Sequence, residues 1–349
     1  MITVSECEIA ADGKPFKLVT LQNSNGMQIR LTDWGATWLS CQVPIQQQLR
    51  EVVLGCSTVA LHVVQGAYLG ASVGRFANRI ANAEFSLHGN HYKLDANQQG
   101  KHQLHGGSVG FAQQRWTISD QQAHSVQFSL FSGDGDQGFP GNLETKVRFS
   151  LREDNAVVVE YSALSDQDTP LNLTNHAYFN LDGESAEQTA LQHRLKINAA
   201  YYLPVDAEGI PKEPLKPVAN SGFDFRQSKP IAQDFLHDAD QKIVAGYDHA
   251  FLLDCPSLGE QPQIELSASN GDLILQIFTD QAAVQVYSGN FLADTPNRTS
   301  GVYANHAGIA LETQALPDTP NHPEWFKYGG ISNAGERYHK TTVFCFKAN

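Results

Sequence analysis

The chain has 349 residues, of which 41% are apolar, and a formal net charge of −13. This composition is typical of a globular protein with a substantial core and excludes a disordered chain. The acidic balance disfavours nucleic acids and anionic membrane surfaces as partners, because both require a basic surface.

The start of the chain and its cysteines favour a cytoplasmic protein. Residues 1–6 contain neither the basic nor the apolar part of a signal peptide, and no apolar run in the chain is long enough to span a membrane. The five cysteines are odd in number, widely spaced and form no C-x-x-C pair. We therefore expect buried thiols in a reducing compartment, with neither a disulfide framework nor a zinc knuckle.

Apolar and polar residues alternate with a period of two in many segments. Such alternation predicts strands with one face in a core and one in water. In chain order, the clearest apolar sets are Met27, Ile29 and Leu31, then Val126, Phe128 and Leu130, then Val147, Phe149 and Leu151.

Turn residues separate these runs. Asn25-Gly26 and Asn270-Gly271 predict two-residue hairpin turns, because both residues of each pair can adopt positive φ. Gly89-Asn90 predicts a third hairpin, between 85–87 and 92–94. Helical segments are scarce, and residues 231–236 are expected to form one or two turns of helix.

The pattern as a whole predicts an all-β fold, a large antiparallel β-sandwich with two sheets packed face to face. No linker or repeat divides the chain, so we expect a single domain over residues 1–349. Three long irregular stretches, 133–142, 202–225 and 316–330, are candidates for functional loops.

Two segments place arginine or histidine beside glycines. In 70–80, Arg79 could hold hydroxyl oxygens with its rigid donor fork, or it could be a structural partner of a carboxylate. In 103–107, His105 precedes two glycines and lies on an accessible tight turn. His102 and His105 form an H-x-x-H pair, but no third ligand has a suitable spacing, so we expect no metal site.

Three further segments place a titratable residue in an apolar strand or beside aromatics. His176 lies between two asparagines and two aromatics, which suits a sugar-binding wall as well as a packing role. Asp248 follows Tyr247 and could accept sugar hydroxyls or form a turn. Glu312 follows an apolar strand, where burial would raise its pKa and fit it to act as a base, unless it forms a buried ion pair.

Together these segments, in this order, resemble the aldose 1-epimerase (galactose mutarotase) family. The resemblance runs from Trp34-Gly35-Ala36 to Thr342-Val343-Phe344 and includes the blocks 134–141, 202–206 and 287–291. It implies the galactose mutarotase-like supersandwich and an enzyme that interconverts the α and β anomers of free hexoses such as galactose and glucose. It implies no cofactor.

The resemblance also implies residue roles. The histidine of the Thr-Asn-His segment, here His176, would be the general acid, and the glutamate of the Leu-Glu-Thr segment, here Glu312, the general base. We expect them on opposite sides of the hemiacetal, each stabilising the charge of the other. The implied sugar contacts are Asn78, Arg79, His105, Tyr178, Asp248 and Gln285. The chain departs from the common family pattern at His102-Gln103 and at 333–336.

Three other functions remain open at this level. A glycoside hydrolase could use Asp248 and Glu312 as its two carboxylates. A carbohydrate-binding module would bind sugar without speeding anomer exchange. An epimerase of hexose 6-phosphates would need a basic phosphate site, whereas the surroundings of Asp248 and Glu312 are neutral or acidic. The sequence does not predict the oligomeric state.

Overall fold

The computed structural model describes residues 1–185, 189–212 and 214–349. Within these ranges the strands pair antiparallel and helices are few and short. The α-helices are α1 (Val59–Val64) and α2 (Ala239–Ile243), and the 3₁₀ helices are Ala81–Ala83, Phe111–Gln113, Asp136–Gly138, Ala190–Gln192, Ile231–Asp234, Thr319–Asn321 and Pro323–Tyr328. In the part of the chain so described, no helix has the length and apolarity to cross a membrane.

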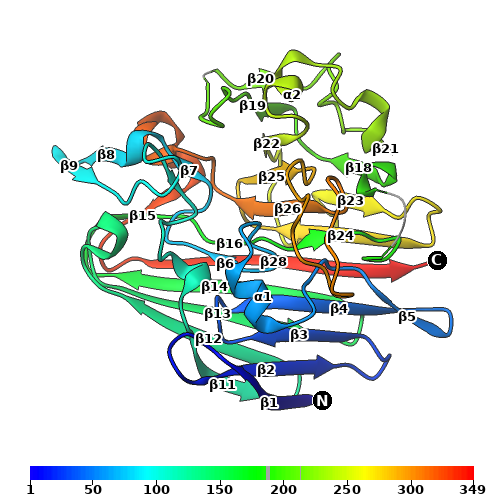
Figure 1. Cartoon of the computed structure of the whole chain (residues 1–349). Helices are drawn as coiled ribbons and strands as arrows, with labels where there is room; N and C mark the ends of the chain where they lie inside the picture. Colours follow the sequence, from blue (N-terminus) through cyan, green and yellow to red (C-terminus); the bar gives the residue numbers. More distant parts are fainter. Residues whose placement is uncertain (186–188, 213) are drawn as a thin grey trace.

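A nine-stranded sheet forms one layer of the molecule (Figure 1). Its central strand, β28 (Arg337–Ala348), pairs with β14 (Ala156–Ser165) on one side and β24 (Leu273–Thr279) on the other. The C-terminal strand therefore lies in the middle of the sheet. The remaining strands are β11 (Thr117–Gln122), β12 (Ser125–Ser132) and β13 (Leu143–Leu151) beyond β14, and β23 (Ile264–Ser267), β18 (Arg194–Ile197) and β21 (Lys229–Pro230) beyond β24.

Two smaller sheets pack against this layer (Figure 1). The five-stranded sheet contains β1 (Ile2–Ile9), β2 (Pro15–Gln22), β3 (Gln28–Thr32), β4 (Thr37–Ile45) and β5 (Gln48–Glu51). The six-stranded sheet contains, in spatial order, β17 (Tyr178–Phe179), β26 (Ile309–Gln314), β25 (Ala283–Tyr287), β22 (Asp248–Leu252), β19 (Tyr201–Leu203) and β20 (Lys216–Pro217). A bridge between Val53 and Phe179 joins their edges. The predicted sandwich is confirmed, with one of its two layers divided between two sheets.

Four short pairs complete the strands. They are β6 (Ser72–Val73) with β16 (Thr174–Asn175), β7 (Arg79–Ile80) with β10 (Gln103–Leu104), β8 (Glu84–Leu87) with β9 (Asn90–Lys93), and β15 (Thr169–Leu171) with β27 (Gly330–Ser332).

One apolar core lies between the layers. Trp38 of β4 is fully buried, and its ring packs edge-on against Phe179 and Phe344. The predicted alternation is confirmed in the core: Met27, Ile29, Val126 and the other apolar residues of those sets are buried, except Leu130, which is half-buried.

The hairpins form where expected, but the turns differ. The loops that contain Asn25-Gly26 and Asn270-Gly271 each have five residues, 23–27 and 268–272, rather than two. Within each Asn-Gly pair, only the glycine has positive φ. In the first loop the Asn23 amide oxygen accepts the Met27 N–H and closes the wider turn. The third hairpin turns at His88-Gly89, which both have positive φ, because Leu87 pairs with Asn90.

The loops and the helical segment are close to expectation. Residues 231–234 form a single 3₁₀ helix, and 316–330 contains two more rather than remaining irregular. The cysteines are all free, but only Cys41, Cys56 and Cys345 are buried; Cys255 is exposed, contrary to the expectation of buried thiols throughout.

Candidate functional site

The six-stranded sheet places polar side chains side by side on one face. Gln285 of β25 pairs with Glu312 of β26, and Tyr178 of β17 pairs with Ala310. Because side chains alternate along a strand, Glu312 points away from the face on which its neighbour Leu311 enters the core. Asp248, in β22, completes this row, since its Oδ1 accepts a 2.6 Å hydrogen bond from Gln285 Nε2.

The β7–β10 pair supplies the opposite wall. Asn78 and His105 exchange hydrogen bonds: the His105 N–H donates to the Asn78 carbonyl at 2.9 Å, and the Asn78 N–H donates to His105 Nδ1 at 3.2 Å. The glycine after His105 is required, because a Cβ at Gly106 would lie 1.9 Å from the Gly74 carbonyl oxygen. Close backbone packing therefore aims the His105 ring.

His176 lies between β16 and β17. Its backbone N–H donates to the Ala71 carbonyl, and its carbonyl accepts from the Gly70 N–H, both at 2.9 Å. Asn175 has a structural role, because its side chain donates to the Gly70 carbonyl and accepts from the Ala177 N–H. The polar residues around His176 thus fix the backbone that carries the ring.

These walls enclose a cavity of about 370 Å³, lined by Gly66, Ala67, Tyr68, Asn78, Arg79, Leu104, His105, His176, Tyr178, Asp248, Tyr287, Phe291, Thr295 and Glu312. Seven of the eight predicted site residues line it. Gln285 lies behind Asp248 and is buried. Sequence reasoning missed Tyr68, whose ring centroid is 4.6 Å from that of His105, and Tyr287 and Phe291, although the last two belong to a quoted block.

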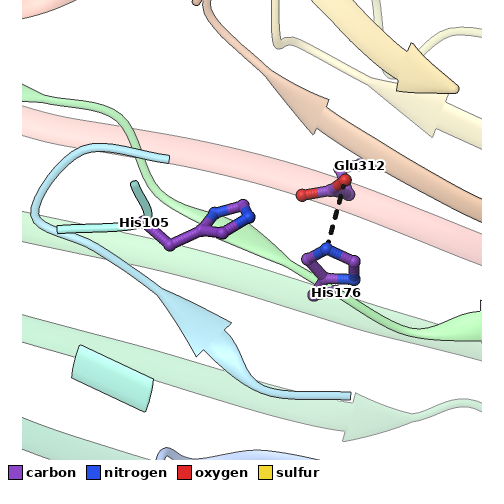
Figure 2. A group of neighbouring side chains, drawn as sticks. All are labelled: His105, His176 and Glu312. Atoms are coloured by element: carbon purple, nitrogen blue, oxygen red, sulfur yellow. Dashed lines mark ion pairs between the residues drawn. The ribbon is translucent and has the colours of Figure 1, made fainter. Parts of the chain in front are cut away.

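The proposed acid and base are adjacent. His176 Nε2 is 3.5 Å from Glu312 Oε1 (Figure 2), and both side chains are buried. Glu312 Oε2 is also buried and has no hydrogen-bond partner among the described residues. β26 and the β16–β17 connection thus bring the two side chains to the same part of the cavity.

Burial opposes charge on both members of this pair. It raises the pKa of Glu312 well above its usual value, with a smaller upward contribution from Asp248 and a downward one from Arg79. It lowers the pKa of His176 to about 4. Burial is the largest cause of both shifts, and each shift favours the neutral form of its group.

The two arginines of segment 70–80 differ. Arg75 is buried and donates to Ser132 Oγ and to the carbonyls of Ser132, Gly133 and Pro140, so it is structural. Arg79 lines the cavity. Burial raises the pKa of Asp248, and the positive charge of Arg79 lowers it.

His105, His176 and Glu312 could together hold a metal ion, because one ligand atom from each lies within 4.8 Å of the others (Figure 2). A metal-bound histidine normally donates its other N–H to an acceptor. Here the Asn78 N–H donates to His105 Nδ1, which leaves the proton of the neutral ring on Nε2. His105 is therefore better suited to donate a hydrogen bond to a hydroxyl than to bind a metal ion.

The H-x-x-H pair does not converge on one ion. His102 Nδ1 accepts from the Asn82 N–H, and its Nε2 lies 3.5 Å from Glu208.

Comparison with known proteins identifies relatives over almost the whole chain. The family model described as aldose 1-epimerase matches residues 17–345. An aldose 1-epimerase of Haemophilus influenzae is 55% identical over 97% of this chain and 98% of its own. An Escherichia coli aldose 1-epimerase is 47% identical at the same coverage, and human galactose mutarotase is 36% identical over 97% of this chain and 96% of its own.

Solved structures agree. Galactose 1-epimerase from Lactobacillus acidophilus superposes with a TM-score of 0.86 at 26% identity, covering 100% of this chain and 99% of that one. An aldose epimerase homologue from C. elegans gives a TM-score of 0.87 at 26% identity, covering 95% and 99%.

Proposed function

We propose how the cavity works in this chain, which belongs to the aldose 1-epimerase family: Glu312 is the general base and His176 the general acid in the exchange of the α and β anomers of a free hexose. The observation that carries this assignment is their contact, 3.5 Å between Nε2 and Oε1, in the wall of the cavity. Glu312 Oε2 is left without a partner among the described residues and can accept a hydroxyl proton.

An adjacent acid and base suit this reaction, because the two oxygens involved are bonded to the same carbon. Glu312 removes the proton of the C1 hydroxyl while His176 protonates the ring oxygen. The C1–O5 bond breaks as the C1 carbonyl forms. After rotation about C1–C2, His176 recovers its proton and Glu312 returns the other as the ring closes on the opposite face. General acid–base groups contribute about 10²–10⁴-fold each.

The pair needs only one proton in total. The neutral pair that burial favours becomes the reactive ion pair when the Glu312 proton moves to His176. Since the net charge of the cavity does not change, sugar hydroxyls that hydrogen-bond to the carboxylate can drive this transfer. The two groups therefore titrate as a unit.

The remaining residues bind the sugar in this proposal. Arg79 and His105 donate to hydroxyls, Asp248 accepts, Asn78 and Tyr178 line the site, and Gln285 holds Asp248 in place. Arg79 is the only lysine or arginine among the described lining residues, and it faces carboxyl groups, which favours an unphosphorylated hexose. We also propose that residues 1–349 act as one domain in the cytoplasm, without a cofactor.

Substitution of the pair tests the assignment. Glu312→Gln keeps the size of the side chain but removes the base, so the catalysed part of anomer exchange should fall by about 10²-fold or more. His176→Asn should act similarly, and the double variant should be little worse than either single one, because the groups act as a unit. Exchange is followed by polarimetry of freshly dissolved α-galactose.

The controls are Glu260→Gln and His237→Asn, at exposed positions. Both should exchange anomers at the wild-type rate. If folded Glu312→Gln kept near-full kcat, the base would be misassigned, and Asp248 would be the next residue to test.

A further inference from the structure

The guanidinium of Arg79 makes two contacts with neighbouring side chains. Its Nε donates a 2.9 Å hydrogen bond to Gln98 Oε1, and its Nη1 lies 3.4 Å from Asn78 Oδ1. Arginine has five N–H donors in a rigid plane. These two contacts leave three donors for a ligand. Gln98 itself does not line the cavity and was not among the predicted site residues.

Gln98 is fixed by its own turn. Its backbone N–H donates to the His102 carbonyl at 3.0 Å, and its carbonyl accepts from the N–H groups of Lys101 and His102 at 3.0 and 3.2 Å. The turn leads directly into β10 and therefore into His105. The acceptor for Arg79 is thus positioned by the same strand pair that aims the histidine.

A second loop, around Gly209, also approaches the guanidinium closely. Gly209 has φ of +77°, and a Cβ there would lie 2.8 Å from Arg79 Cζ, so only glycine allows this approach without a shift. Asp206 Oδ1 caps the loop by accepting from the N–H groups of Glu208 and Ile210. Lys101 Nζ lies 2.5 Å from Glu208 Oε2 and ties this loop to the turn that holds Gln98.

We propose that Gln98 is a positioning residue that, together with the close approach of Gly209, fixes the rotation and reach of the Arg79 guanidinium in the sugar site. Gln98 contacts no sugar in this scheme. It determines affinity by removing the rotamers in which Arg79 would point away from the cavity. This role of Gln98 rests on the proposed function, because sugar binding and anomer exchange are the properties by which it is measured.

A matched pair of variants tests it. Gln98→Asn shortens the side chain by one methylene, so its oxygen no longer reaches Arg79 Nε, and KM for galactose should rise about 10-fold with kcat nearly unchanged. Gln99→Asn makes the same change at the next position, which is exposed and whose positive φ asparagine tolerates, and KM should stay at the wild-type value. Gln98→Glu keeps an acceptor at the original length and should restore KM.

Gly209→Ala provides an independent approach, since its methyl group should displace the guanidinium and raise KM without removing any hydrogen-bonding side chain. Thermal unfolding is measured on every variant. An unchanged KM in Gln98→Asn, a loss confined to kcat, or a KM that Gln98→Glu fails to restore would overturn the proposal. If the wild-type protein showed no exchange at all, the proposed function would fail instead, and galactose binding by calorimetry would still test Gln98.

Discussion

Glu312 illustrates how its surroundings, rather than its residue type, set the chemistry of a side chain. A glutamate in water is ionised at neutral pH. In this cavity burial raises its pKa, Asp248 raises it further and Arg79 lowers it. The base thus sits between one charge of each sign, and its protonation depends on both.

This arrangement predicts the effect of Asp248→Asn on the pH dependence of exchange. The negative charge of Asp248 disfavours ionisation of Glu312, so a neutral amide should lower the pKa of Glu312. Because Glu312 releases the last proton of the pair, the basic limb of the kcat/KM profile should therefore move to lower pH. KM should rise, because the amide is a weaker acceptor for sugar hydroxyls. Polarimetry across pH 4–9 measures both.

The control is again Glu260→Gln, whose profile should superpose on that of the wild-type protein. A basic limb that moved to higher pH in Asp248→Asn would show that Asp248 does not oppose ionisation of the base.

At the scale of an element, segment 70–80 combines a structural and a functional arginine four residues apart. Arg75 satisfies three carbonyls and one hydroxyl in the loop at 132–140, and burial lowers its pKa to about 10. Arg79 faces the cavity. The tight β6 and β7 pairings place the two side chains in different surroundings.

We therefore expect opposite consequences from the same substitution. Arg75→Ala should lower the free energy of unfolding by at least about 3 kcal/mol, because it leaves several buried acceptors unpaired. Arg79→Ala should leave the melting temperature nearly unchanged and raise KM about 10-fold or more, since a charge-assisted hydrogen bond to the sugar is lost. Calorimetry and exchange kinetics on the two variants, each serving as the control of the other, distinguish these outcomes.

Should Arg79→Ala unfold the protein as readily as Arg75→Ala, the distinction would be wrong and Arg79 would be structural.

For the whole molecule, several histidines are buried in the neutral form. Burial lowers the pKa of His62 and His249 to about 3 and that of His176 and His193 to about 4. The unfolded chain binds these protons from about pH 6.5 downward, whereas the folded protein does not. These groups therefore contribute stability that is present above pH 6.5 and is lost as the pH falls toward 3.

His62 allows this linkage to be measured away from the cavity. His62 Nε2 accepts a 2.9 Å hydrogen bond from the Cys56 N–H, and the amide oxygen of His62→Gln can replace that acceptor. Removing one titrating group should reduce the slope of unfolding free energy against pH by up to about 1.4 kcal/mol per pH unit between pH 6 and 4. Urea denaturation at several pH values gives the slope, and equal slopes in variant and wild type would rule out a neutral buried His62.

Local sequence patterns were sufficient to predict the strands, most of the core and seven of the residues that line the cavity. Alternation with period two is a local property, so Val147 and Phe149 indicate a strand with one buried face without any knowledge of its partner. The resemblance to aldose 1-epimerases rests on blocks of adjacent residues, which is why it identified seven residues that do line one cavity.

How those residues meet follows from the three-dimensional packing and not from any local pattern. The pairing of Gln285 with Glu312 and the contact of Glu312 with His176, 136 positions apart, depend on strand register and sheet packing. Gln98 and Gly209 lie in loops that carry no periodic signal, so their approach to Arg79 could not be predicted. The direction of each pKa shift follows from burial, which is a property of the packed molecule and not of any segment.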